Sequence, residues 1–105
     1  MTEKRQPSYK LELFKTAAGS RSDFRVTATA IKGAAALGFG RKEMVAVIQG
    51  MKHDHFYKSM TGYSDHRVWQ DVYHVPSRAG VLYIKFTRDA VTAFLLLSFK
   101  AKDDD

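Results

Sequence analysis

The chain of 105 residues has 17 Lys or Arg against 11 Asp or Glu, a net charge of +6, and no cysteine. Its length suits one domain, and the lack of cysteine excludes a disulfide framework and a thiolate zinc site. We expect one domain over residues 1–102 and an acidic tail at residues 103–105. The surplus of positive charge favours a polyanionic partner such as nucleic acid.

No stretch of the sequence has the character of a targeting or membrane-spanning segment. The N-terminus runs straight into polar sequence, and the longest apolar stretch, Ala90 to Phe99, is too short for a bilayer. We therefore expect a soluble, cytoplasmic protein that makes no contact with a membrane.

Helical patterns predominate in the first half of the chain. Residues 8–18 are ambiguous, because Leu11, Phe14 and Ala18 recur as in a helix, whereas Tyr9 to Leu13 alternates as in a strand. The Ala-Ala-Gly ending of this segment favours a helix.

Two further helices are predicted at residues 24–38 and 41–51. Gly33 lies inside the first, where a glycine costs about 1 kcal/mol relative to alanine. The second has apolar residues at the i, i+3, i+4, i+7 spacing from Met44 to Met51.

The second half of the chain has the composition of β-structure. Strands are predicted at residues 68–75, 81–87 and 93–100, which are rich in β-branched, aromatic and other apolar residues. The last two are joined by residues 88–92, a connection short enough for a hairpin and too short for a parallel crossover. The fold class is therefore predicted as α+β, with N-terminal helices packed on a small C-terminal antiparallel sheet.

Alternation along the last two strands assigns their side chains to faces. In residues 81–87 the buried face is expected to carry Leu82, Ile84 and Phe86. In residues 93–100 the buried row is expected at Leu95, Leu97 and Phe99, which leaves Phe94, Leu96, Ser98 and Lys100 on the other side. The face opposite the core is then predicted to carry Tyr83, Lys85, Ser98 and Lys100. Gln70 is a polar residue within the apolar strand 68–75, where its amide needs hydrogen-bond partners, and a cleft is one place to find them.

Residues 52–74 interleave aromatic and basic side chains beside four histidines. This mixture is typical of surfaces that bind single-stranded RNA, because exposed bases stack on aromatic rings while phosphates meet cations. We expect RNA contacts from Tyr57, Tyr63, His66, Arg67 and Lys85.

Other chemistries find less support in the same segment. His53, His55 and His66 offer only a weak metal-binding pattern without a well-placed carboxylate, so no metal site is predicted. Ser64, Asp65 and His66 are consecutive, and they cannot form a nucleophilic triad by their own local geometry.

The segment FYKSMTGYSDHRVWQDVYH at residues 56–74, with VLYIKF at 81–86 and LLLSFKAK at 95–102, resembles the MqsR family of toxins. The resemblance is strong over residues 55–75, good in the two following strands and weak over the first 50 residues. It implies a RelE-like fold and a messenger-RNA interferase, an endoribonuclease of single-stranded mRNA. It also implies a partner, a zinc-binding and DNA-binding antitoxin of the MqsA type.

The resemblance also implies site residues. The family's functional lysine falls on Lys58, its glutamine on Gln70, its strand tyrosine on Tyr83 and its last lysine on Lys100. Cleavage is then expected through the ribose 2′-hydroxyl, with no metal and no cofactor. The hairpin between the last two strands is longer than in the family, which leaves the placement of Lys100 opposite Tyr83 open.

A non-enzymatic nucleic-acid-binding module is the alternative. Helices 24–38 and 41–51 could form a helix-turn-helix-like unit, with Arg41 and Lys42 at the start of the second helix. Core-type residues dominate that helix, so we rank this function below the nuclease.

Overall fold

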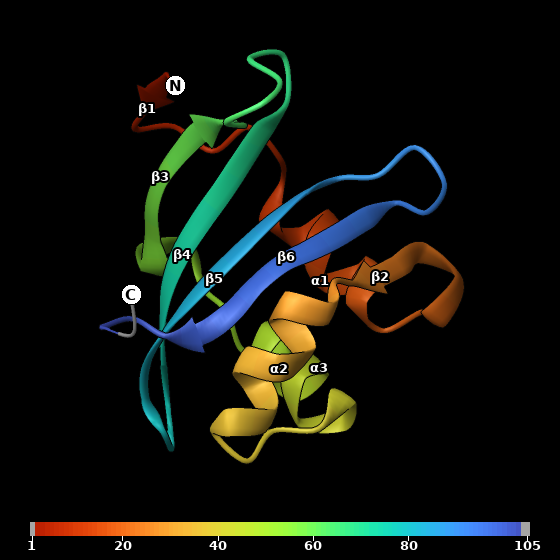
Figure 1. Cartoon of the computed structure of the whole chain (residues 1–105), viewed down its shortest axis with the longest axis vertical. Coiled ribbons are helices and arrows are strands. Elements are labelled where there is room, and N and C mark those ends of the chain that lie inside the picture. Colours follow the sequence, from red (N-terminus) through yellow and green to blue (C-terminus); the bar gives the residue numbers. More distant parts are fainter. Residues whose placement is uncertain (1, 104–105) are drawn as a thin grey trace.

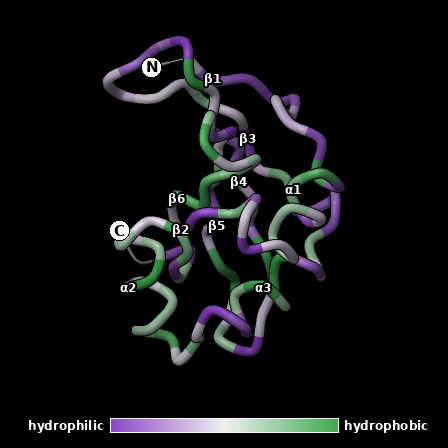
Figure 2. The backbone as a smooth tube through the Cα atoms, turned by 90° about the vertical axis from the view of Figure 1, so that its right-hand side faces the viewer, coloured by the Kyte–Doolittle hydropathy of each residue, from purple (hydrophilic) through white to green (hydrophobic). Residues whose placement is uncertain are grey.

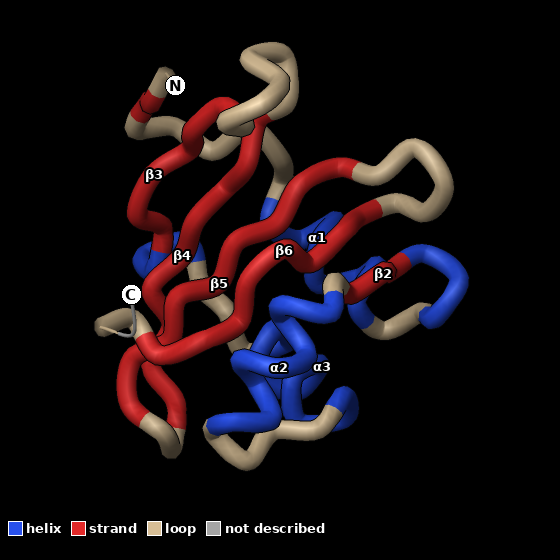
Figure 3. Tube along the Cα trace, viewed as in Figure 1, coloured by secondary structure: helices blue, strands red, loops and turns tan. Residues whose placement is uncertain are grey.

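The computed structural model describes residues 2–103, which form one mostly antiparallel sheet with three α-helices (Figures 1 and 3). Six strands lie in the order β1-β3-β4-β5-β6-β2. The strands are β1 (Glu3–Lys4), β2 (Phe24–Val26), β3 (Phe56–Thr61), β4 (Trp69–Ser77), β5 (Gly80–Arg88) and β6 (Phe94–Ala101), and the helices are α1 (Leu11–Ala18), α2 (Ala28–Ala36) and α3 (Arg41–Gln49). The α+β prediction is confirmed. Of the expected acidic tail, residues 104–105 lie outside the described part of the chain.

Helices α1 and α3 bury one face of the sheet, and α2 packs along β6. In Figure 2, at right angles to Figure 1, α1 and α3 lie on the same side of the strands. Phe14 of α1 stacks on Phe86 of β5, with ring centroids 3.6 Å apart, and Phe24 and Phe94 meet Phe14 edge-on. We call this side the covered face. In residues 2–103 no helix is long and apolar enough to cross a membrane.

Three strands were not predicted from the sequence. β1 pairs with β3 and forms one edge of the sheet, and β2 forms the other edge by pairing in parallel with β6. The helix expected over residues 24–38 therefore begins too early. Thr27 caps the true start of α2, because its Oγ1 accepts a hydrogen bond from the amide of Ala30 at 3.1 Å. The helix expected over residues 8–18 begins only at Leu11.

A β-bulge corrects the face assignment in β6. Lys85 pairs with Ser98 but Phe86 pairs with Leu96, so Leu97 is an extra residue in β6. Beyond the bulge the alternation is reversed. Phe94 and Leu96 are buried in the core, whereas Leu95 and Leu97, expected in the buried row, are only half-buried. Phe99, Ser98 and Lys100 lie before the reversal, towards the end of β6 that pairs with the start of β5, and there the predicted faces are correct.

Gly33 in α2 has a packing role that explains its place inside a helix. A Cβ at this position would lie 2.3 Å from the carbonyl oxygen of Phe99 and 3.3 Å from the Cβ of Lys100. Only glycine lets α2 approach the backbone of β6 so closely. The helix thus buttresses the part of β6 that carries Lys100.

Candidate active site on the open face of the sheet

The sheet face opposite the helices, which we call the open face, carries the predicted catalytic side chains. Figure 1 looks onto it, with α1 behind the strands. In the sheet register His74 is directly opposite Tyr83, and Tyr83 is directly opposite Lys100. Directly paired residues point to the same face, so these three side chains form one row across β4, β5 and β6. The placement that the sequence left open is resolved, because Lys100 pairs directly with Tyr83.

The ammonium of Lys100 lies over the Tyr83 ring, 5.3 Å from its centroid. On the other side of Tyr83, the His74 ring is 6.1 Å away between centroids and tilted by 41°. Tyr83 therefore lies between the cation of Lys100 and the imidazole of His74.

A second row brings two more lysines to the open face. Lys58 pairs with Val72, Val72 with Lys85, and Lys85 with Ser98. The pKa of Lys85 is lowered by burial first and then by the charges of Lys100 and Lys58. Lys85 is thus close enough to both other lysines for their charges to act on it, and together the three make a positive field suited to a phosphate.

Lys58 is held by the N-terminal strand. Its ammonium donates to the carboxylate of Glu3 at 2.5 Å, across the short β1–β3 pairing. This hydrogen bond raises the pKa of Lys58 and lowers that of Glu3. Tyr57 lies next to Lys58, with its ring centroid 5.3 Å from the ammonium.

Gln70 is half-buried in β4, opposite Met60 of β3. It is two residues from Val72, so its side chain points to the same face as the lysine row. Its amide nitrogen lies near Gly62, 3.5 Å from the place a Cβ would take there. The glutamine is therefore at the end of the open face where the β3–β4 loop begins.

His74 is a site residue that the sequence analysis did not select. Its ring stacks on Tyr57, with centroids 4.2 Å apart and planes 23° apart. Burial lowers its pKa, the charges of Lys102 and Lys58 lower it further, and Asp103 opposes them. The lowered pKa favours the neutral imidazole, which is the form that can accept a proton. Alternation in β4 outward from the buried Tyr73 would have placed it on this face.

Three of the predicted RNA-binding residues lie away from both rows. Tyr63, His66 and Arg67 are in the β3–β4 loop, where Tyr63 is 89% exposed. Arg67 is ion-paired with Asp65 of the same loop at 3.2 Å. The structure brings Tyr57 and Lys85 to the open face and leaves these three at its rim.

The polar groups of the covered face have a structural role. Asp71 is fully buried, and its carboxylate accepts hydrogen bonds from the amides of Ser8 and Tyr9 at 3.0 Å. Burial, and then the charge of Asp71, raise the pKa of Tyr73 to about 12. Tyr73 is thus a core phenol, in contrast to Tyr83 on the other face.

Two polar side chains of α3 form hydrogen bonds to the backbone of other elements. Arg41 donates to the carbonyl of Phe24 at 3.0 Å, and Gln49 donates to the carbonyl of Lys15 at 2.7 Å. Two side chains that a DNA-reading helix would use are thus bound within the protein. In residues 2–103 no three His, Cys, Asp or Glu are grouped so as to hold a metal ion.

Comparison with known proteins gives a consistent result. The family model described as "Motility quorum-sensing regulator, toxin of MqsA" matches residues 6–101. The mRNA interferase toxin MqsR of Escherichia coli K12 is 40% identical over 100 residues, which cover 95% of this chain and 99% of that protein.

Proposed function

The chain belongs to the MqsR toxin family, and from this premise we propose that it is a messenger-RNA endoribonuclease, the toxin of a toxin–antitoxin pair. The observation that carries the proposal is the pairing of Tyr83 with Lys100 on the open face, beside Lys58, Lys85 and His74. A cluster of cations around groups able to exchange protons suits the cleavage of a phosphodiester.

In the proposed reaction the ribose 2′-oxygen attacks the adjacent phosphorus and the bond from phosphorus to the 5′-oxygen breaks. The products are a 2′,3′-cyclic phosphate and a 5′-hydroxyl, so the substrate supplies the nucleophile. Lys58 and Lys100 would stabilise the negative charge that develops on the phosphoryl oxygens, and Lys85 adds to the same field. Gln70 would orient a phosphate or a base edge from the end of the face.

Two protons move in this reaction. We assign the acceptor of the 2′-hydroxyl proton to His74, whose neutral imidazole is held by stacking on Tyr57. The phenol of Tyr83 then donates a proton to the departing 5′-oxygen. The centroids of the two rings are 6.1 Å apart on neighbouring strands, so both groups can act at the same phosphodiester. The net change is one proton moved from the 2′-oxygen to the 5′-oxygen, with the His74 and Tyr83 protons restored through water.

The rim of the open face would bind the RNA strand on either side of the cut. Tyr57 on the open face and Tyr63 at its rim offer rings for base stacking, and His66 and Arg67 extend the rim over the loop. The substrate is accordingly single-stranded mRNA, whose splayed bases can reach such rings. We propose that the protein acts in the cytoplasm, where it would meet this substrate.

The family model describes the toxin of MqsA, and we propose that the partner of this chain is an MqsA-like, zinc-binding and DNA-binding antitoxin. Expression of the chain alone should arrest the growth of a bacterial host. Co-expression of such an antitoxin should restore growth, and failure to do so would refute the pairing.

The proposed function is tested by incubating the purified protein with a long synthetic RNA in excess EDTA and mapping the ends. We expect cleavage to persist and every product to carry a 2′,3′-cyclic phosphate or a 5′-hydroxyl. Loss of cleavage in chelator, restored by a divalent ion, would overturn the metal-independent reaction. Absence of cleavage under all ionic conditions would overturn the nuclease.

A further inference from the structure

A second group of cations lies at the sheet edge formed by β2, away from the proposed catalytic rows. A pocket of about 400 Å³ opens there. It is lined by Arg21, Phe24, Arg25, Val26, Thr27, Arg41 and Leu95. Three arginines and no acidic residue form this lining, so the pocket is suited to an anion.

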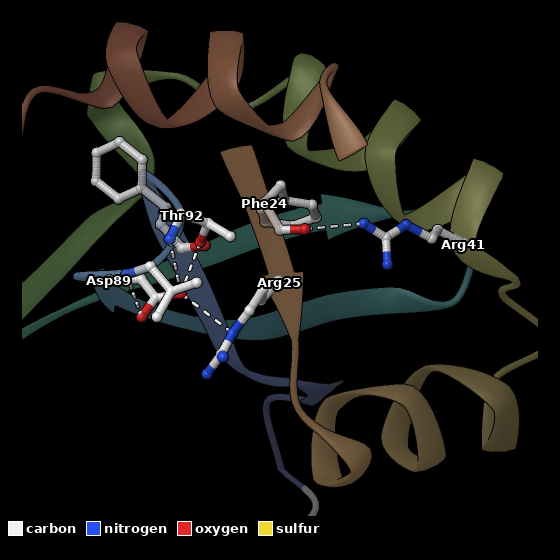
Figure 4. Close-up of polar contacts among 7 residues, drawn as sticks. Phe24, Arg25, Arg41, Asp89 and Thr92 are labelled. Atoms are coloured by element: carbon white, nitrogen blue, oxygen red, sulfur yellow. Dashed lines mark hydrogen bonds and ion pairs between the residues drawn. The ribbon is translucent and has the colours of Figure 1, made fainter. Parts of the chain in front are cut away.

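Arg41 reaches this pocket from the first turn of α3 in a fixed orientation. One terminal nitrogen of its guanidinium donates to the carbonyl of Phe24 at 3.0 Å, and the group lies 5.5 Å from the centroid of the Phe24 ring (Figure 4). An arginine that is already held loses less conformational entropy when it binds an anion. The other guanidinium nitrogens keep their capacity to donate.

Arg25 is oriented in a similar way by the β5–β6 loop. Its Nε lies 3.1 Å from the carboxylate of Asp89, which is fixed in turn by the hydroxyl of Thr92 at 2.6 Å. That hydrogen bond lowers the pKa of Asp89, and therefore the ion pair persists near neutral pH. Figure 4 shows the terminal nitrogens of Arg25 pointing away from Asp89. The Arg25 side chain is 52% exposed, so these donors can meet a ligand.

The pocket is connected to the open face through β6. Arg25 pairs with Leu95, which lies on the open side because its neighbours Phe94 and Leu96 are buried in the core. Lys100 is five residues further along the same strand. At roughly 3.3 Å per residue, the two sites are about 16 Å apart along β6. A single strand of RNA bound at Lys100 can therefore reach the arginines within a few nucleotides.

We propose that the pocket lined by Arg21, Arg25 and Arg41 binds a backbone phosphate of the RNA substrate, a few nucleotides from the cut. The inference rests on the proposed nuclease function and extends its binding site beyond the catalytic rows. Phosphate oxygens match the paired donors of a guanidinium, and a ligand with many phosphates uses both sites at once.

The test uses RNA that cannot be cut, oligonucleotides of four and of twelve nucleotides with 2′-O-methyl riboses. Their affinities are measured over a series of salt concentrations for the wild type, Arg21→Gln and Arg25→Gln. Each variant should weaken the twelve-nucleotide RNA more than the four-nucleotide RNA. The slope of log affinity against log salt should fall by about 0.7 for each lost phosphate contact with a single strand. Lys10→Gln removes one exposed charge at the start of α1, outside both clusters and outside residues 52–74, and it should leave the slope unchanged.

Two results would overturn the proposal. One is equal weakening of both lengths with an unchanged salt slope, which would mean that the arginines add only diffuse charge. The other is that the wild type binds inorganic phosphate and Arg25→Gln does not, while the RNA affinity of the two proteins is the same, which would make this a site for free phosphate. An unfolding curve of each variant is measured to check that the fold is retained. Cleavage of a long RNA by the wild-type protein tests the nuclease function by itself. If the wild type cuts this RNA, a negative binding result overturns only this inference.

Discussion

The covered face and the open face of the sheet are built from the same strands, in alternation, and have opposite chemistry. On the covered face Leu82, Ile84 and Phe86 are fully buried against the helices. On the open face Tyr83 and Lys85 from the same strand meet Lys100 and other polar groups. Because neighbouring residues point to opposite sides, a reaction centre and a core can share one strand without sharing a side chain. Substitutions on the open face should therefore lower the cleavage rate, and substitutions on the covered face should lower the stability of the fold.

The largest effect is expected on the open face. Tyr83→Phe removes only a hydroxyl and should lower the cleavage rate by about 10²–10⁴, as loss of a general acid typically does. Stability should change by less than about 0.5 kcal/mol, as for most surface substitutions. Lys100→Ala should cost a comparable factor in rate. The measurements are single-turnover cleavage and thermal melting on the same preparations, and wild-type cutting by Tyr83→Phe would remove its hydroxyl from the mechanism.

The matching change on the covered face is Phe86→Ala. Its ring stacks on Phe14 and is fully buried, so the free energy of unfolding should fall by about 3–5 kcal/mol. Urea unfolding measures this loss. The protein that remains folded should cut RNA near the wild-type rate, because the ring points away from the open face. A specific rate as low as that of Tyr83→Phe would mean that the two faces are coupled.

A smaller loss of stability is expected for Asp71→Asn. The carboxylate accepts the amides of Ser8 and Tyr9, and an asparagine keeps one acceptor oxygen while placing an N–H₂ group among these donors. The free energy of unfolding should fall by about 1–3 kcal/mol. Hydrogen exchange at Ser8 and Tyr9 should accelerate more than exchange in β5. Uniform acceleration over the sheet would contradict a local role for Asp71.

The parts of the fold that could be predicted depend on local alternation. Tyr83 and Lys85 were assigned to the right face because period-2 patterning in β5 is uninterrupted. In β6 the extra residue at Leu97 reverses that period, and a bulge has no signature in the pattern of apolar residues there. The bulge is visible only in the pairing of β6 with β5.

The short edge strands could not be predicted for a related reason. β1 and β2 have two and three residues, too few to show a period, and each forms by pairing with a distant strand. The ion pair of Glu3 with Lys58 and the arginine pocket both depend on these pairings. His74 was missed because the strand 68–75 has polar residues on both faces, which hides its register. The resemblance supplied Lys58 and Gln70, which no alternation argument had placed.

The smallest expected effect concerns the acidic side of the pH–rate profile. A neutral His74 accepts the proton, so cleavage should fall as the pH drops through the pKa of this residue. The pKa lies below its ordinary value because of burial and of the charges of Lys102 and Lys58. The fall should therefore occur at a lower pH than for a free histidine, whose pKa is about 6.5. In His74→Gln this limb should vanish, whereas it should persist in His53→Gln, which changes an exposed histidine outside the open face.

Two charges near the C-terminus tune this limb in opposite directions. The charged groups facing His74 are Lys58 from β3, Lys100 from β6, and Lys102 and Asp103 beyond β6, and the phenols are Tyr57 and Tyr83. Lys102→Gln removes a cation that disfavours the imidazolium, so the pKa and the limb should move up in pH. Asp103→Asn removes an anion that favours it, so both should move down. Each shift should be less than about one pH unit, because exposed charges act through water, and it should shrink in high salt. Shifts of the same sign in both variants, or a limb that neither variant moves, would show that another group controls the acidic limb and that His74 is not the proton acceptor.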